Sequence, residues 1–396
     1  MKKCIFFLSL MAMVFGNQNL FAQDTATSIY PAKTFHIAVF APMYLDSTFN
    51  NTDFNASKSI PKFIMPAVDF IQGAHIAFDT LALSGKAAQV AIYDSKSNTQ
   101  PISWLIRFNK LDNVDLIIGA VKEPDYRELA DFALQKKIPF ISAIYPNAGS
   151  VHENPFLFIV NSTLKAHCEG IFSYILQKHG TDRVYLIKKK GDDRIESYFK
   201  EINIKEGKPL LNIKTIVVDS TISPYSLRYR IDTMHTAVII GASLDEDLAR
   251  SLADACYPLQ KNHPLILIGM PNWDGFKSLY KKDAYTGFPI RFTTPHYEEQ
   301  GNLFDSVLIK KYFQLYRAKP ADMAYKGFGI AWYFTNLLLK YPGDFVSHIN
   351  DTAFAAFHTY NFRPVYSSPQ QQVPDYYENK HLFIMEILNG NILREW

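Results

Sequence analysis

The segment spanning residues 112–150 constrains the fold of this chain more than any other stretch. An apolar run at 114–118 predicts a buried strand, which a Gly–Ala pair ends. From Pro124 onward, apolar residues recur at a spacing close to 3.6, which predicts an amphipathic helix. Proline suits its first turn, because an amide there has no intrahelical partner. A second apolar run at 139–144 predicts another strand, so the segment forms one strand–helix–strand unit of a parallel sheet.

The same alternation of strand and helix occurs in two series along the chain. Predicted strands at 34–41 and 89–93 precede the central segment, and a second series runs from a strand at 183–187 to one at 264–269. Two such series predict an α/β fold with two doubly wound, Rossmann-like lobes, each with a parallel central sheet. Ligands of such sheets bind beyond the carboxyl ends of the strands, so the loops at 120–125 and 143–149 are the first candidate binding surfaces.

We expect the chain to cross between the two lobes three times, near Asn161, Thr294 and Tyr341. Closure around a ligand would then be a hinge motion about these three segments. The last part of the chain is expected to add a helix and a β-hairpin whose turn is the Asn389–Gly390 pair. The predicted boundaries are 33–160 with 295–341 for the first lobe, and 161–294 with 342–396 for the second.

The letters VDLIIGAV…ELADFALQKKIPFISA of the central segment resemble the type I periplasmic binding proteins, in particular their branched-chain amino-acid binding branch. Upstream, GAHIAFDTL…VAIYDSKSN resembles the family's first helix and the strand end after it. The resemblance covers nearly all of the chain after residue 33. It implies a monomeric solute-binding protein without enzymatic activity or cofactor, which captures a small ligand in the cleft between its lobes for uptake or sensing. An ABC permease or another envelope protein would be its partner.

The residues expected to line this cleft lie at or just past the ends of predicted strands. Several are aromatic, and aromatic side chains at such positions can stack on a ligand, although plain packing is the alternative for each of them. The first lobe is expected to supply Tyr44, Lys122, Glu123, Tyr126, Ser142 and Tyr145, and the second Asp193, Ser243 and Trp273, with Tyr297 beside the second crossing.

The sequence departs from the family where the ligand's carboxylate would bind. The family's loop after the first central strand carries a serine hydroxyl, whereas residues 120–125 have no hydroxyl and include Glu123 and Asp125. Of the serines in the next family loop, only Ser142 is matched. A buried ligand carboxylate beside two like charges would be costly. We therefore expect a neutral or cationic ligand, or one held mainly by aromatic stacking, rather than a standard α-amino acid.

The N-terminal residues 1–22 are expected to be a secretory signal peptide. Lys2 and Lys3 form its charged start, the apolar run at 5–15 is too short to span a bilayer, and Ala22 offers a small residue for cleavage. The expected location is thus the periplasm, and an uncleaved anchor is the alternative. Cys4 precedes the apolar run instead of following it, which argues against a lipid anchor. Beyond the leader, the sequence contains no stretch typical of a membrane helix.

The charge balance and the motifs exclude two broad classes of function. The net charge is +3, and a nucleic-acid partner would require a strongly basic face. The sequence lacks the serine-hydrolase elbow, the zinc-protease helix, the P-loop and the dinucleotide fingerprint, so we expect no enzyme. A non-transport receptor or scaffold on the same fold, with a protein or cell-wall partner, stays open as an alternative to solute binding.

Three further features each have two readings. His296 with Glu298 and Glu299 is a metal site or a polar loop, and we expect no metal because the wider ligand pattern is missing. The lysines at 188–190 are an anion-binding patch or a solvated loop. The cysteines at 168 and 256, in predicted helices with apolar neighbours, form a disulfide or remain buried free thiols.

Overall fold

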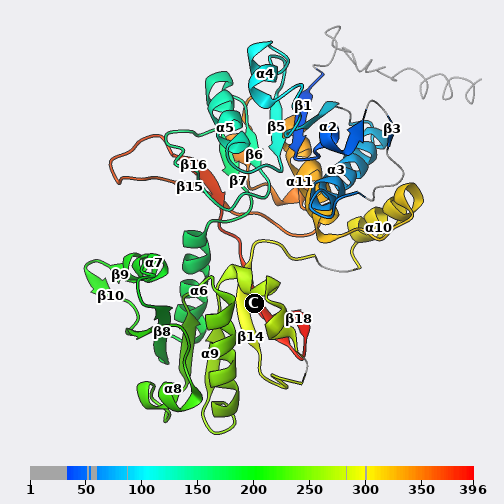
Figure 1. The fold of residues 1–396 in the computed structure, drawn as a ribbon. Coiled ribbons are helices and arrows are strands. Elements are labelled where there is room, and N and C mark those ends of the chain that lie inside the picture. Colours follow the sequence, from blue (N-terminus) through cyan, green and yellow to red (C-terminus); the bar gives the residue numbers. More distant parts are fainter. Residues whose placement is uncertain (1–33, 51–52, 55–59, 87, 282, 299–300) are drawn as a thin grey trace, which may run out of the picture. The chain divides into compact units, whose positions relative to one another are not determined.

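The computed structural model describes residues 34–396 except 51–52, 55–59, 87, 282 and 299–300. Its two large sheets have seven strands each, in the orders β15-β16-β7-β6-β5-β1-β4 and β11-β8-β12-β13-β14-β17-β18 (Figure 1). The predicted α/β fold of two lobes on mostly parallel sheets is therefore confirmed. The predicted signal peptide lies outside the described residues.

The first sheet is parallel from β16 to β4, and β15 pairs with β16 in the antiparallel sense. All four residues of β5 are buried, as expected for a strand covered by helices on both faces. The strands are β1 (His36–Ala41), β4 (Gln89–Asp94), β5 (Leu116–Gly119), β6 (Phe140–Ser142), β7 (Leu157–Ile159), β15 (Phe362–Val365) and β16 (Tyr376–Asn379).

The second sheet is parallel from β11 to β14, after which β17 and β18 add an antiparallel edge. Its strands are β8 (Arg183–Lys189), β11 (Ile213–Val218), β12 (Ala237–Gly241), β13 (Leu265–Ile268), β14 (Ile290–Thr294), β17 (Phe383–Leu388) and β18 (Asn391–Arg394). Two small antiparallel pairs complete the described strands: β2 (Phe49–Asn50) with β3 (Asp53–Phe54), and β9 (Ile204–Lys205) with β10 (Lys208–Pro209).

Helices cover both faces of the first sheet. One apolar cluster joins the sheet to α3, α10 and α11, and another joins its opposite face to α4 and α5. In the second sheet, one large cluster includes residues of α6, α7, α8 and α9. The α-helices are α2 (Leu45–Thr48), α3 (Met65–Leu83), α4 (Ile102–Arg107), α5 (Asp125–Lys136), α6 (Leu164–Lys178), α7 (Arg194–Ile202), α8 (Pro224–Arg230), α9 (Glu246–Leu259), α10 (Leu303–Tyr316) and α11 (Asp322–Lys340).

Side-chain caps fix where several of these helices begin. Thr163, Asp245 and Asn302 each accept a hydrogen bond from a backbone N–H three residues later, at the starts of α6, α9 and α10. Such caps satisfy amides that have no partner within the helix. Because α6 and α9 follow directly on β7 and β12, their caps also set where the loops at the sheet edge end.

Two glycines allow the long helices α3 and α11 to pack closely. A Cβ atom added to Gly73 would lie 1.9 Å from the carbonyl oxygen of Ala324, and one added to Gly327 would lie 2.0 Å from that of Phe70. Since backbone atoms cannot move aside easily, neither position accepts a larger residue without a shift of the helices. This contact fixes the position of Lys326, which precedes Gly327 in α11 and contributes to the site described below.

The third crossing differs from the prediction. We assigned residues 342–396 to the second lobe, but β15 and β16 belong to the first sheet, where β16 pairs with β7. Phe362 and Tyr377 pack on Phe158 of β7 at ring distances of 6.0 and 5.3 Å, which explains why these strands join this sheet. The chain therefore makes its third crossing between Asn379 and Phe383, not at Tyr341.

The predicted helix after residue 346 is also wrong. The helical structure there consists of two short 3-10 turns, η3 (Val346–His348) and η4 (Thr352–Phe354). Two other 3-10 turns, η1 (Pro271–Gly275) and η2 (Lys277–Tyr280), lie between β13 and β14. The predicted hairpin is confirmed, with Asn389–Gly390 joining β17 to β18. Asn389 and Gly390 both have positive φ angles, 51° and 76°, as a tight hairpin turn requires.

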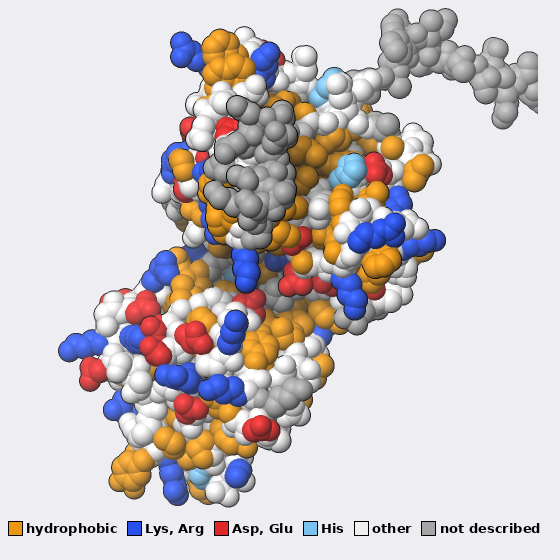
Figure 2. Space-filling model, turned by 45° about the vertical axis from the view of Figure 1, so that its right-hand side comes forward, with side chains coloured by type: hydrophobic (Ala, Val, Ile, Leu, Met, Phe, Trp, Pro, Cys, Tyr) orange, Lys and Arg blue, Asp and Glu red, His pale blue; other side chains and the backbone are white. Residues whose placement is uncertain are grey.

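The surface carries charges of both signs. Figure 2 shows Lys and Arg side chains interspersed with Asp and Glu over the face that it presents, in keeping with the net charge of +3. Within the described part of the chain, every helix is too short or too polar to cross a membrane.

Candidate functional site

A cavity of about 460 Å³ lies where loops from both sheets meet. It is bordered by the loops that follow β6 and β7 in the first sheet and β8, β12, β13 and β14 in the second, so it lies at carboxyl strand ends, where such sheets bind ligands. Its volume falls within the range of small-molecule sites. The polar lining includes Asn147, Asn161, Arg194, Asn272, Asp274, Thr294, His296 and Lys326.

The turn η1 forms one wall of the cavity and is held from below by Trp273. The Trp273 ring is fully buried, and its Nε1–H donates to the carbonyl oxygen of Ser243 at 3.0 Å. Gly241 and Gly269 make room for it, because a Cβ atom on either would lie within 2.5 Å of the ring. With this side chain anchored in the core, the flanking residues Asn272 and Asp274 line the cavity.

Asn272 presents an unpaired acceptor to this wall. Its Nδ2 donates to the carbonyl oxygen of Leu244 at 2.8 Å, which fixes the orientation of the amide. Its Oδ1 is buried and accepts no hydrogen bond from another described residue. Buried polar atoms normally have a partner, so the packing around η1 leaves this oxygen unsatisfied beside the cavity wall.

Lys326 of α11 brings a positive charge to the opposite wall. Burial lowers the pKa of its ammonium group, an effect that the charges of Asp322, Glu298 and Asp274 partly offset. Within the described part of the chain, its Nζ forms neither a hydrogen bond nor an ion pair of 4.0 Å or less. A partly desolvated ammonium without a close counterion is a favourable position for an anionic group.

Behind this wall lies a small void of about 10 Å³ that His296 and Lys326 share with Glu298 and His358. Burial raises the pKa of Glu298 to about 7 and lowers the pKa of His358 to about 4, and it holds that of His296 well below its ordinary value. Both histidines are thus neutral at pH 7, with ring centroids 5.8 Å apart. Each has a buried Nε2 that finds no partner among the residues described.

The predicted alternatives for the loop around His296 can now be compared. The described His, Cys, Asp and Glu side chains form no group that could hold a metal ion. Glu299 lies outside the described residues, so the polar loop stays the expectation here.

None of the site residues predicted from the sequence contributes to the cavity lining that the described residues form. In the first lobe, Lys122 and Glu123 are exposed, and the backbone N–H of Tyr44 donates to Asp94 at 3.1 Å. Tyr126 is fully buried and packs against Tyr145, with ring centroids 4.9 Å apart. Plain packing, the alternative reading, therefore accounts for Tyr126.

The remaining predicted residues have structural contacts as well. Ser142 and Ser243 are buried, and the hydroxyl of Ser243 accepts the N–H of Asp245 at 3.2 Å. Asp193 is exposed and forms an ion pair with Lys188. Tyr297 packs on Phe383 at 5.5 Å, just behind the cavity. Trp273 is enclosed in the core, as described above, which is what the packing alternative expects. The predicted ligand roles of these residues stay predictions.

Of the two loops considered first, residues 143–149 contribute Pro146 and Asn147 to the lining, whereas residues 120–125 contribute none of the described lining residues. Asn147, Arg194, Leu244 and His296 lie one or two residues from predicted positions, and Asn272 and Asp274 flank Trp273. In the 3-10 turn η1, with about three residues per turn, successive side chains point in different directions, so a Trp273 ring anchored in the core leaves its neighbours to face elsewhere. Lys326 had a separate signal, a lone charge within an otherwise apolar stretch of α11.

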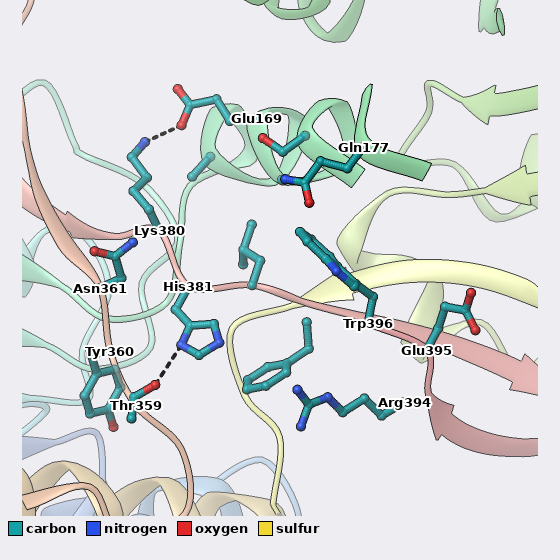
Figure 3. A pocket seen from close by; sticks show the side chains of 15 residues that line it. Glu169, Gln177, Thr359, Tyr360, Asn361, Lys380, His381, Arg394, Glu395 and Trp396 are labelled. Carbon is teal, nitrogen blue, oxygen red and sulfur yellow. Dashed lines mark hydrogen bonds and ion pairs between the residues drawn. The ribbon is translucent and has the colours of Figure 1, made fainter. Parts of the chain in front are cut away.

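A larger groove of about 980 Å³ lies beside the third crossing (Figure 3). Its charged side chains already have partners. Lys380 binds Glu169 at 2.8 Å and Glu378 at 2.6 Å, His381 lies 3.1 Å from the hydroxyl of Thr359, and Arg394 stacks on aromatic rings. Since the smaller cavity has unpaired buried atoms and the groove's charges are paired, we take the cavity as the candidate site.

The lysine run and the two cysteines prove structural. Lys188 is buried and pairs with Asp193 and Glu196, and Lys189 lies 2.7 Å from Asp245, so these two side chains hold loops together and do not form an open anion-binding patch. The cysteines at 168 and 256 are buried free thiols, which confirms the second reading, and burial raises the pKa of each to about 12.

Comparison with family models found none that matches this sequence, and comparison with curated proteins likewise found no match. Solved structures do resemble it. A branched-chain amino acid ABC transporter protein from Rhodospirillum rubrum is 13% identical, with a TM-score of 0.61 over 92% of this chain and 100% of that one. An ABC transporter substrate-binding protein from Desulfitobacterium hafniense, in complex with leucine, is 10% identical, with a TM-score of 0.54 over 92% and 100%.

A third similar structure is a periplasmic ligand-binding protein of a branched-chain amino acid ABC transporter from Burkholderia xenovorans. It is 11% identical, with a TM-score of 0.54 over 88% of this chain and 95% of that one. At such low identity the likeness establishes the fold, which is that of the type I periplasmic binding proteins. The resemblance noted in the sequence is thereby confirmed for the architecture.

Proposed function

We propose that this chain is an exported solute-binding protein that captures a small ligand in the cavity of about 460 Å³ and delivers it to an ABC permease. One observation carries the proposal: loops at the strand ends of both sheets, together with Lys326 of α11, surround a single space of ligand size. Two of the similar structures are described as substrate-binding or ligand-binding proteins of ABC transporters, which supports the same role.

The proposal includes the predicted periplasmic location and excludes turnover of the ligand. A site that spans two lobes couples occupancy to their relative motion, because a ligand that contacts both favours the arrangement in which both contacts form. A permease can recognise that arrangement, which is how capture would lead to uptake. Amides, hydroxyls and charges dominate the polar lining, and such groups orient a ligand without transforming it.

A thermal-shift screen with two blocking variants tests the proposal. The protein would be screened against amino acids, organic acids, sugars and their phosphates, since a ligand at one hundred times its Kd stabilises the folded state by about 2.7 kcal/mol. Asn147→Trp places a bulky ring at the exposed rim of the cavity, and Gln177→Trp places one at the exposed rim of the larger groove. We expect a stabilising ligand whose effect is lost in Asn147→Trp and kept in Gln177→Trp. The opposite pattern, or an unresponsive protein, would contradict the proposal.

A further inference from the structure

We propose that the ligand of this cavity carries an acidic group, a carboxylate or a phosphate, and that the side chain of Lys326 binds it. The inference rests on the proposed function, and it names the class of ligand. It also reverses the expectation from the sequence, which favoured a neutral or cationic ligand. The reversal follows from which charged side chains actually line the cavity.

The carboxylates behind the earlier expectation are neutralised elsewhere. Asp125 lies 2.8 Å from the ammonium of Lys96, and Glu123 lies 3.9 Å from the guanidinium of Arg127. Neither acidic side chain contributes to the cavity lining formed by the described residues. They therefore do not oppose an anionic ligand there.

The charged side chains that do line the cavity are two cations and one carboxylate. Arg194 stands at the start of α7 on one side, and Lys326 stands on the other, with Asp274 of η1 between the loops. Glu298 and Asp322 influence Lys326 from outside this lining, and Glu298 is partly protonated near pH 7. A cationic ligand would have to displace or oppose two fixed positive charges, whereas an anionic one complements them.

Neutral groups beside Lys326 suit the same ligand. His296 shares two cavities with Lys326, and its buried Nε2, with no described partner, can carry a hydrogen and donate to an anionic oxygen. Asn272 adds a neutral amide to the same lining, so it does not oppose an acidic ligand either. The ligand is thus a small acid.

Calorimetric titrations with matched pairs of compounds test this inference. Each pair shares a skeleton and differs in charge: succinate and succinamide, glutamate and glutamine, glucose 6-phosphate and glucose. The pairs also separate a carboxylate from a phosphate. The variants are Lys326→Met, Lys326→Arg, and Lys277→Met as a control that removes the same charge from an exposed position outside the cavity lining. Circular dichroism confirms that each variant is folded.

We expect the acid of at least one pair to bind at least tenfold more tightly than its neutral partner. Lys326→Met should weaken that acid about 10- to 100-fold, because charge-assisted hydrogen bonds are the strong ones. The same variant should leave the neutral partner within about twofold, Lys326→Arg should retain part of the affinity, and Lys277→Met should change nothing.

Two contrary results have different meanings. Tight binding of a neutral or cationic compound, unaffected by Lys326→Met, would overturn the inference and leave the solute-binding function intact. Absence of binding by every compound, charged or neutral, would overturn the inference and the proposed function together.

Discussion

Replacing Trp273 with alanine should destabilise the second lobe severely, because this side chain is enclosed in the core. The ring is fully buried between Gly241 and Gly269. Removing a buried tryptophan typically costs 3–5 kcal/mol, and the carbonyl of Ser243 would lose the Nε1–H that it accepts at 3.0 Å, which costs about 1–3 kcal/mol more. We expect a loss of roughly 4–8 kcal/mol, a large fraction of the 5–15 kcal/mol typical of a folded domain.

Urea unfolding followed by far-UV circular dichroism measures this loss. A companion variant, Gly269→Ala, would place a methyl group 2.0 Å from the Trp273 ring and should itself destabilise the lobe. In the double variant the ring is gone, so the alanine at 269 should cost much less, and the two changes should be strongly non-additive. Additive effects would show that the two residues are not in contact.

The same variants separate the two roles considered for Trp273. If its ring formed a ligand wall, Trp273→Ala would leave stability within about 1 kcal/mol of the wild type and abolish ligand binding. A conservative change, Trp273→Phe, keeps most of the volume and should preserve both the fold and the cavity lining by Asn272 and Asp274. Loss of binding in Trp273→Phe without loss of stability would refute the reasoning.

Three further predictions concern the rest of the fold. In urea unfolding, Lys380→Met should lower the free energy of unfolding by about 3–5 kcal/mol, because it leaves the buried carboxylate of Glu378 without its cation. Lys165→Met breaks an exposed ion pair and should lower it by less than about 1 kcal/mol. Equal losses in the two variants would contradict this. His358 has a pKa near 4 when folded against 6.5 when unfolded, so the folded state binds fewer protons between these values and stability falls as the pH drops through them. The wild type should therefore lose roughly 2–3 kcal/mol more than His358→Gln between pH 7 and 4.5, and identical pH profiles would refute this. Cys168 and Cys256 should resist a thiol reagent at pH 8 until urea unfolds the chain, whereas rapid reaction in buffer would show that they are accessible.

Most of the helices and strands of this fold can be predicted from the hydrophobic periodicity of the sequence and from the order of the predicted strands. The strand predicted at 89–93 is observed as β4 (Gln89–Asp94), and the strand predicted at 183–187 is observed as β8 (Arg183–Lys189). The part from 342 to 382 was mispredicted for a physical reason. Strands β15 and β16 are short, and what assigns them to the first sheet is aromatic packing on Phe158, a contact between residues more than 200 positions apart that no local pattern reveals.

The candidate cavity lies near several of the loops considered from the sequence, but the loop at 120–125 does not contribute to its described lining. The rule for parallel sheets located the cavity edge, because it depends only on strand direction. The rule does not say which side chains of a loop face the cavity. The ring of Trp273, for example, fills the space beside Gly241, and its neighbour Asn272 lines the cavity. Our proposal of an acidic ligand differs from the expectation from the sequence because Lys326 reaches the cavity from a helix far along the chain from the loops considered.

A crystal structure of the protein with the best compound from the screen tests the central claim most directly. The account predicts density for one ligand in the cavity, in contact with both Asn272 of the second lobe and Lys326 of the first. An acidic group of the ligand should lie within hydrogen-bonding distance of Lys326 Nζ. Density in the groove beside Trp396, with the cavity occupied by water alone, would contradict it.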